Sequence, residues 1–290
     1  MAVMRSIFYV PAHRADFVEK CPKYPADIIT LDLEDAVPVS EKAAARKAAA
    51  ENLAHCASGG AKVYVRINNW ETGMTNDDLE AVVLPGLDGV TLAKTGCADD
   101  VKRLDWKLEE LEQRRGIPVG TVKISMLLET AKGIANAEEC CRASKRCVNA
   151  IFGAVDYCKD MRVTLTNEGF EQMYGRFKVG VACRAAGIAA IDAPFVDYMN
   201  TEAFEKNVLG GIQMGFEGRM IINPRQIEPS NRLYAPSEES IAWAEKIVAA
   251  FEEGLTRGLA AVSVDNKMVD TPVYLNALDI LHRRDEINAR

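Results

Sequence analysis

The segment KISMLLETA, residues 123–131, places an acidic residue directly after a stretch that reads as a buried strand. Residues 124–128 are apolar apart from one serine, which is typical of a strand covered on both faces in a parallel sheet. Glu129 ends this strand, and Thr130 begins a stretch in which apolar residues recur at helical spacing. In parallel α/β proteins the active site forms at the carboxyl ends of the strands. Glu129 is therefore a candidate functional residue.

The next apolar segment repeats this arrangement. Residues 148–153 form a second strand pattern, and Asp156 lies just past its end. Either acid alone is best interpreted as a helix cap or a solvated loop charge. Two acids at equivalent places on successive strands instead predict a site for a hard cation, because Mg²⁺ takes oxygen ligands from one or two carboxylates. We therefore predict that Glu129 and Asp156 bind Mg²⁺, with Mn²⁺ as an alternative ion.

The bulk composition is that of a soluble globular protein. The 290 residues are 48% hydrophobic and 27% charged, and the net charge of −7 argues against a nucleic-acid partner. We find neither a basic-then-apolar leader nor an apolar run of about 18 residues, so we expect neither secretion nor membrane insertion. The eight cysteines include no C-x-x-C pair and there are only three histidines, which argues against zinc and predicts reduced thiols in a cytoplasmic protein.

Strand and helix patterns alternate along most of the chain. Strand patterns begin near residues 6, 27, 62, 88, 121, 148, 187 and 218. Eight successive strand–helix units favour a closed (β/α)₈ TIM barrel, and the competing doubly wound sheet lacks a G-x-G-x-x-G after any strand. We predict a barrel catalytic domain over residues 1–230. Residues 231–290 form a C-terminal helical extension that we expect to cover the site or contribute to an oligomer.

In such a barrel the carboxyl ends of all strands open on one face. Polar residues that the pattern brings to this face are His13, Arg14, Glu34, Asp35, Arg66, Lys94, Glu129, Asp156, Asp192 and Asn223.

Arg66 is the strongest candidate in this set for binding a substrate. A guanidinium beside carboxylates at a strand end suits bidentate binding of a substrate carboxylate. Glu34 and Asp35 are candidate catalytic residues with Arg66, and they either hold metal-bound water or orient Arg66 by ion pairing. Arg5 and Lys94 complete the candidate substrate-binding residues, although a solvated Lys94 is an equally good interpretation.

Several segments together resemble one family along nearly the whole chain. The matching segments are RSIFYVPAHR, ADIITLDLEDAV, VYVRIN, LLETAKGIANAEE, AIFGAVDYCKDM, ACRAAGIAAID, GFEGRMIINPRQIEP, APSEESIAWA and DNKMVDTP. They resemble the citrate lyase β-subunit-like (CitE-like) proteins of the HpcH/HpaI aldolase family, which are similar to malyl-CoA and citramalyl-CoA lyases.

This resemblance implies a TIM barrel with a C-terminal extension, assembled as a homotrimer or a hexamer. It implies that Glu129 and Asp156 hold Mg²⁺ and that Arg66 binds the carboxylate of the substrate. It also implies that Asp270 enters the active site of a neighbouring subunit as the acid/base.

The expected function is a Mg²⁺-dependent carbon–carbon lyase. It would cleave or form a β-hydroxyacyl-CoA such as malyl-, citramalyl- or citryl-CoA, with acetyl-CoA and a 2-oxo acid as the other reactants. Two alternatives stay open: an HpaI-type aldolase acting on free 4-hydroxy-2-oxo acids, and a citrate lyase β subunit working on an acyl-carrier protein. The expected partners are therefore small molecules and further copies of the chain, with no nucleic acid and no membrane.

Overall fold

The structure of the protein is a computed structural model that describes residues 3–289. The chain divides into two compact units, one formed by residues 4–231 and the other mainly by residues 232–289. In the first unit eight strands close into a barrel in chain order, with every neighbouring pair parallel. The strands are β1 (Ser6–Pro11), β2 (Ile28–Asp32), β3 (Lys62–Ile67), β4 (Gly89–Leu92), β5 (Lys123–Leu128), β6 (Cys147–Phe152), β7 (Ala189–Asp192) and β8 (Gly218–Ile221). This topology confirms the predicted (β/α)₈ barrel.

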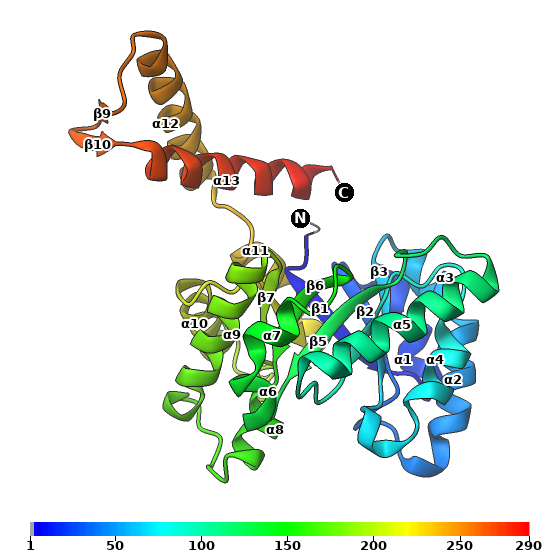
Figure 1. Ribbon diagram of the computed structural model, residues 1–290. Coiled ribbons are helices and arrows are strands. Elements are labelled where there is room, and N and C mark those ends of the chain that lie inside the picture. Colours follow the sequence, from blue (N-terminus) through cyan, green and yellow to red (C-terminus); the bar gives the residue numbers. More distant parts are fainter. Residues whose placement is uncertain (1–2, 290) are drawn as a thin grey trace. The chain divides into compact units, whose positions relative to one another are not determined.

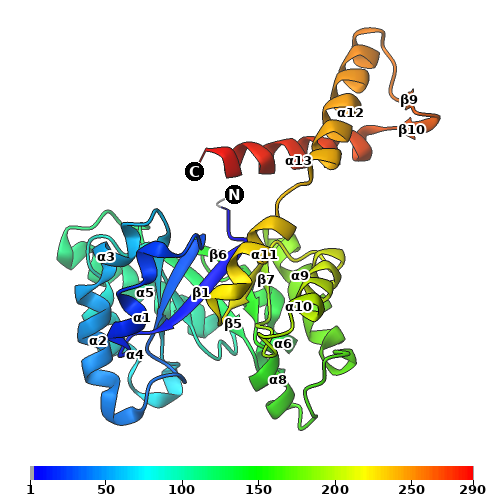
Figure 2. The ribbon, with the colours of Figure 1, turned by 180° about the vertical axis from the view of Figure 1, so that it is seen from behind.

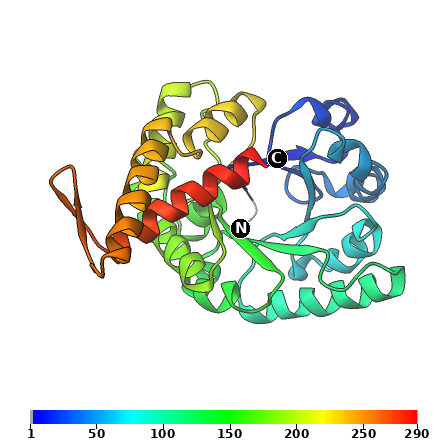
Figure 3. The ribbon, with the colours of Figure 1, turned by 90° about the horizontal axis from the view of Figure 1, so that it is seen from above.

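Helices follow the strands and form the outer layer of this unit, as Figures 1 and 2 show. They are α1 (Ala15–Val18), α2 (Lys42–Glu51), α3 (Leu53–Ala57), α4 (Thr75–Val82), α5 (Ala98–Arg115), α6 (Ala131–Ala135), α7 (Ala137–Cys141), α8 (Ala154–Asp160), α9 (Met173–Ala186), α10 (Thr201–Gln213) and α11 (Ile227–Leu233). Short 3₁₀ helices are η1 (Cys21–Lys23), η2 (Val39–Glu41), η3 (Trp70–Thr72), η4 (Phe170–Gln172) and η5 (Pro224–Gln226). Figure 3 shows the helices of the barrel unit encircling the strands.

The barrel interior is a packed core below a polar rim. Ile28, Tyr64, Leu127 and Ile151 are among the buried side chains that form one apolar cluster inside the strands. Gly89 makes room for this packing, since a Cβ atom there would lie 2.6 Å from the ring of Tyr64. The buried Ser125 and Asn149 also lie within the strands and bond each other, but the charged side chains that can form a site lie at the carboxyl ends of the strands.

The C-terminal unit has a core of its own. It contains α12 (Glu238–Thr256), a hairpin of β9 (Val262–Val264) and β10 (Lys267–Val269), and α13 (Thr271–Asn288). The hairpin turns at Asp265 and Asn266, whose φ angles of 51° and 61° are those that a tight hairpin turn requires. Phe251, Val264 and Val269 belong to the apolar cluster that joins hairpin and helices. Among residues 3–289, none of the helices has the length and apolar character needed to cross a membrane.

A buried ion pair joins α5 to the strands beside it. Glu112 is fully buried and accepts two hydrogen bonds from the guanidinium of Arg146, at 2.9 and 2.7 Å. The backbone N–H groups of Gly120 and Val122 each donate a further bond of 2.8 Å to the carboxylate. Burial alone would raise the pKa of Glu112, but Arg146 and the two N–H groups outweigh burial and lower it.

We expect Glu112→Gln to reduce the free energy of unfolding by about 3 kcal/mol at pH 7, because it removes the fully buried one of the two carboxylates that pair with Arg146 and leaves only Asp105. The folded-state pKa of Glu112 lies below the unfolded value of about 4.3, so the pair stabilises the fold above that pH and less so as pH falls through the folded pKa. Urea denaturation followed by circular dichroism at pH 7 and at acid pH measures both effects. Glu109→Gln, on the exposed side of the same helix, is the control. Equal stability of the two variants at pH 7 would contradict this account.

Candidate active site

An arginine–aspartate pair lies at the carboxyl ends of β2 and β3. Asp32 is the last residue of β2 and is in register with Arg66 on β3. The Arg66 Nε donates to Asp32 Oδ1 at 2.7 Å, and Nη2 donates to Oδ2 at 2.5 Å. Arg66 is only 7% exposed, and its guanidinium lies over the ring of Tyr9, 5.3 Å from the centre of that ring. Two parallel hydrogen bonds fix its plane, so Arg66 is held rigidly at the barrel mouth.

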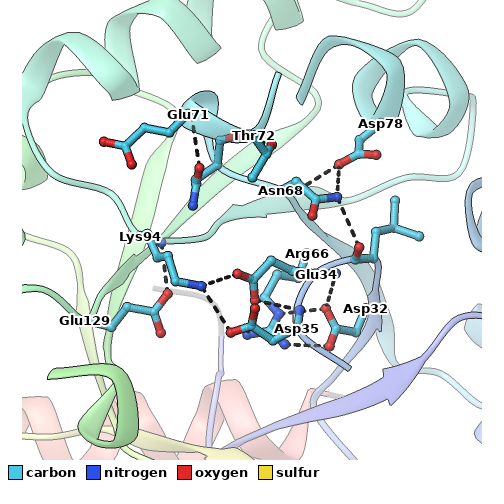
Figure 4. Close-up of polar contacts among 12 residues, drawn as sticks. Asp32, Glu34, Asp35, Arg66, Asn68, Glu71, Thr72, Asp78, Lys94 and Glu129 are labelled. Carbon is cyan, nitrogen blue, oxygen red and sulfur yellow. Dashed lines mark hydrogen bonds and ion pairs between the residues drawn. The ribbon is translucent and has the colours of Figure 1, made fainter. Parts of the chain in front are cut away.

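Further contacts extend from Arg66 across the barrel mouth to β5 (Figure 4). Arg66 Nη1 is 3.2 Å from Glu34 Oε2, and the ammonium of Lys94 pairs with Glu34 Oε1 and lies 3.1 Å from Asp35 Oδ2. Lys94 has a left-handed backbone with a φ of 49°, which is unusual for a residue other than glycine. Its backbone N–H donates to Glu129 Oε1 at 2.9 Å. The structure thus brings Glu34, Asp35, Lys94 and Glu129 together around Arg66.

Lys42 is a site residue that sequence reasoning missed. It lies at the start of α2, yet its buried ammonium donates to the carbonyl oxygens of Leu33 and Glu34, at 2.5 and 2.7 Å. A third bond of 2.9 Å reaches Asn68 Oδ1, so all three N–H groups are used. Burial lowers the pKa of Lys42. This lysine fixes the loop after β2 and thereby the position of Glu34.

Burial and neighbouring charges shift the pKa values of the ionisable groups at the rim. Burial raises the pKa of Glu34, although Arg66 and Lys94 act against this. Burial would also raise the pKa of Asp35, but the hydrogen bond and charge of Lys94 act against it, and the pKa is lowered. For Lys94, burial is outweighed by the two acids, which raise the pKa and keep the ammonium charged.

Glu129 is the most buried of the acids that we predicted to bind metal. It is 3% exposed, and burial raises its pKa to about 8. The charge of Arg66 lowers the pKa of Glu129, whereas the charges of Asp156 and Glu34 raise it further. Gly153, at the end of β6, makes room for it, because a Cβ atom there would lie 2.7 Å from Glu129 Oε2. Asp156 is half-buried in the first turn of α8. The two acids therefore come from neighbouring strand–helix junctions.

The charge balance of this rim fits a divalent cation. Its acids are Asp32, Glu34, Asp35, Glu129 and Asp156, and its cationic side chains are Arg66, Lys94 and, beneath Glu34, Lys42. Within residues 3–289 no three or more His, Cys, Asp or Glu side chains are grouped so as to hold a metal ion by themselves. Mg²⁺ suits this arrangement, because it is commonly bound through one or two carboxylates and completes its shell with water and substrate oxygens.

The structure does not bring Arg5 to this site. Arg5 precedes β1, at the amino end of the barrel, where its Nε and Nη2 atoms bond the carboxylate of Asp27 at 3.0 and 2.8 Å. Amino and carboxyl ends of parallel strands lie on opposite faces of the barrel. The interpretation of Arg5 as a substrate-binding residue is therefore corrected: its side chain joins β1 to the start of β2.

Asp192 and Asp270 each bond groups other than the rim acids. Asp192 ends β7 but faces outward, where Arg176 of α9 and Arg219 of β8 each donate to it at 3.0 Å. Asp270 belongs to the C-terminal unit, in which it caps the first turn of α13 and accepts a long hydrogen bond of 3.3 Å from the Val273 N–H. Asp192 is therefore structural, and Asp270 is described only within its own unit.

Comparisons with known proteins find a matching family and similar relatives along most of the chain. Residues 5–224 match the family described as HpcH/HpaI aldolase/citrate lyase. The chain is 36% identical to the citrate lyase subunit beta of Leuconostoc mesenteroides subsp. cremoris, over 96% of this chain and 92% of the relative. It is 30% identical to an L-malyl-CoA/beta-methylmalyl-CoA lyase of Rhodobacter capsulatus, over 92% and 90% of the two chains.

A solved structure adds a ligand-bound relative. The protein CitE from Mycobacterium tuberculosis, in complex with magnesium, acetoacetate and coenzyme A, is 28% identical and superposes with a TM-score of 0.76 over 97% of both chains.

Proposed function

The chain belongs to the HpcH/HpaI aldolase/citrate lyase family, and we propose that it is a Mg²⁺-dependent carbon–carbon lyase acting on a hydroxyacyl thioester. In the cleavage direction a malyl, citramalyl or citryl thioester gives an acetyl thioester and a 2-oxo acid. The observation that carries the proposal is the combination at one barrel rim of two acids that fit a hard cation, Glu129 and Asp156, with a rigidly held guanidinium, Arg66.

Arg66 retains hydrogen-bond donors for a substrate. A guanidinium has five N–H groups; Asp32 accepts from the Nε group and from one on Nη2, and Nη1 lies 3.2 Å from Glu34 Oε2. In this proposal a substrate carboxylate binds through the N–H groups that remain on Nη1 and Nη2. Because Asp32 fixes the guanidinium plane, a substrate carboxylate would be bound in one orientation.

The proposed reaction is balanced without an oxidant or a reductant. The bond between the thioester α-carbon and the carbinol carbon breaks, and its electron pair moves into a thioester enolate. The hydroxyl group loses its proton as the 2-oxo acid forms, and the enolate gains one to become the acetyl thioester. Glu129 and Asp156 would hold Mg²⁺, which would supply Lewis-acid polarisation of the substrate oxygens. Lys94 and Arg66 contribute positive charge where negative charge develops.

Asp270 is the proposed acid/base that returns the proton to the enolate. It lies between a hairpin and α13 in a unit with its own core, so its position within that unit is well defined. In this proposal residues 231–290 act as a lid, and Asp270 of one chain serves the barrel of a neighbour in a homotrimer or hexamer. The resemblance of the DNKMVDTP segment to the family supports this arrangement.

A second candidate is the β subunit of a citrate lyase, acting on a thioester of an acyl-carrier protein. The observation in its favour is the identity of 36% to a citrate lyase subunit beta, against 30% to a malyl-CoA lyase. Both candidates use the same bond cleavage, so they differ in the carrier of the acyl group.

We expect the purified chain, with Mg²⁺, to cleave at least one of malyl-CoA, citramalyl-CoA and citryl-CoA. Release of a 2-oxo acid, trapped as its phenylhydrazone, measures the reaction. Activity only when citryl-acyl-carrier protein replaces the CoA thioesters would favour the second candidate. Cleavage of free 4-hydroxy-2-oxo acids in place of any thioester would contradict both and favour an aldolase.

We expect Glu129→Ala and Asp156→Ala each to weaken Mg²⁺ binding by at least about 100-fold, because loss of second-shell groups alone commonly weakens metal binding 10- to 100-fold. Isothermal titration of the purified chain with Mg²⁺ measures this effect. Glu139→Ala removes an exposed acid from the neighbouring helix α7 and is expected to leave binding unchanged. Wild-type affinity in both ligand variants would refute the metal site.

We expect Asp270→Asn to fold and bind Mg²⁺ normally but to lose activity by about 10²- to 10⁴-fold, the usual contribution of a general acid/base. Mixing it with the equally inactive Arg66→Ala variant tests the shared site. In a symmetric ring about a quarter of the sites of an equal mixture would combine an intact barrel with an intact tail, and activity should return in proportion. If mass spectrometry shows subunit exchange and no activity returns, each chain uses its own Asp270.

A further inference from the structure

Asn68 is a buried residue whose side-chain amide has a partner at each of its polar atoms. It directly follows β3 and is 2% exposed. Its Oδ1 accepts from the ammonium of Lys42 at 2.9 Å, and its Nδ2 donates to Leu33 O at 3.1 Å and to Asp78 Oδ2 at 2.7 Å. The backbone N–H of Asn68 donates to the same oxygen of Asp78 at 2.8 Å (Figure 4). Both donors and the acceptor of this amide are therefore engaged.

The chemistry of its partners fixes the orientation of this amide. The ammonium of Lys42 can only donate, so the oxygen of Asn68 faces it. The carboxylate of Asp78 can only accept, so the nitrogen of the amide faces that side. Asp78, on α4, is fully buried and accepts a further bond of 2.6 Å from Arg46 Nε. A flipped amide would oppose N–H to an ammonium and oxygen to a carboxylate, so Asn68 has one stable orientation.

Two strand ends of the active site meet at this amide. Lys42 and Asn68 both donate to the carbonyl oxygen of Leu33, which precedes Glu34 in the loop after β2. On the other side, Asn68 is the second residue after Arg66. Between these two points Arg66 Nη1 lies 3.2 Å from Glu34 Oε2. The amide thus joins the backbone segments that present the two side chains of this contact.

We propose that Asn68 is a positioning residue for the lyase reaction, acting through Glu34 on the guanidinium of Arg66. Without the amide, the loop after β2 loses its side-chain connection to the end of β3, and Glu34 no longer has a fixed place beside Arg66. A substrate carboxylate would then meet a guanidinium that Asp32 alone orients. This inference rests on the proposed function and adds a residue on which the geometry of its site depends.

The kinetic test is a double-mutant cycle of Asn68→Ala and Glu34→Gln, with kcat/KM measured for the thioester that the wild-type chain cleaves. We expect Asn68→Ala alone to lower kcat/KM by about 10- to 100-fold, because small displacements of positioned groups have effects of this size. In the Glu34→Gln background the same substitution should lower it by less than about threefold, since residues that act through one another are not additive. Equal losses in both backgrounds would overturn the inference.

Hydrogen exchange followed by mass spectrometry tests the positioning without any substrate. The backbone N–H of Val37 donates to Glu34 O at 3.0 Å, within the loop that Asn68 and Lys42 hold. Exchange across residues 33–37 should be at least about tenfold faster in Asn68→Ala and in Lys42→Met than in the wild-type chain, because the loop opens locally more often. Lys42→Met also replaces Asn68→Ala in the kinetic cycle if the latter does not fold, as judged by circular dichroism and thermal melting.

Two exposed residues provide matched controls. Asn76→Ala on α4 and Lys47→Met on α2 remove side chains of the same types and should alter neither exchange nor kcat/KM. Unchanged exchange in both Asn68→Ala and Lys42→Met overturns the inference, whether or not the chain cleaves a thioester. A wild-type chain that cleaves no thioester contradicts the proposed function, and the role of Asn68 in the reaction with it, so the two failures are distinguishable.

Discussion

A guanidinium removed from water at the barrel mouth is the constraint on which the site depends. A buried arginine is stable only if carboxylates replace its lost hydration with good geometry. Asp32 provides two such bonds to Arg66, and Glu34 provides a third contact. Glu34 in turn accepts a hydrogen bond from the ammonium of Lys94. The backbone N–H of Lys94 donates to the carboxylate of Glu129. A series of contacts thus connects the Asp32–Arg66 pair of β2 and β3 to the predicted metal ligand after β5.

The same rim contains more negative than positive charge, and this imbalance explains why a cation belongs there. Glu129 is buried beside Asp156 and Glu34, and both acids make its ionised form less favourable. A divalent ion between Glu129 and Asp156 would reverse that repulsion. Its binding would also stabilise the folded barrel, since the unfolded chain has no such arrangement of acids.

Sequence patterns predicted the fold and the strand-end positions of Glu129 and Asp156, because both depend on features that recur along the chain; their role in binding metal stays a prediction. Strand–helix alternation determines the barrel, and strand ends determine where Glu129 and Asp156 lie. Lys42 was not predictable, because a lysine at the start of a helix usually faces solvent and only the folded loop brings Leu33 and Glu34 within its reach. Arg5 was predicted to bind substrate, and it belongs to a segment that resembles the family. It precedes β1, however, and therefore lies at the amino end of the barrel, on the face opposite the site.

The contrast between Asp32 and Asp192 shows what local sequence leaves undetermined. Each is the last residue of its strand, and each is in register with an arginine of the next strand, Arg66 and Arg219. Asp32 lies at an even spacing from the interior residue Ile28 on the same strand, and its side chain therefore points inward. Asp192 directly follows the interior residue Ile191, and its side chain therefore points outward. In strands buried on both faces, apolar periodicity does not distinguish these two cases. A shift of one residue therefore decides whether the same charge pair builds the active site or attaches helices to the barrel.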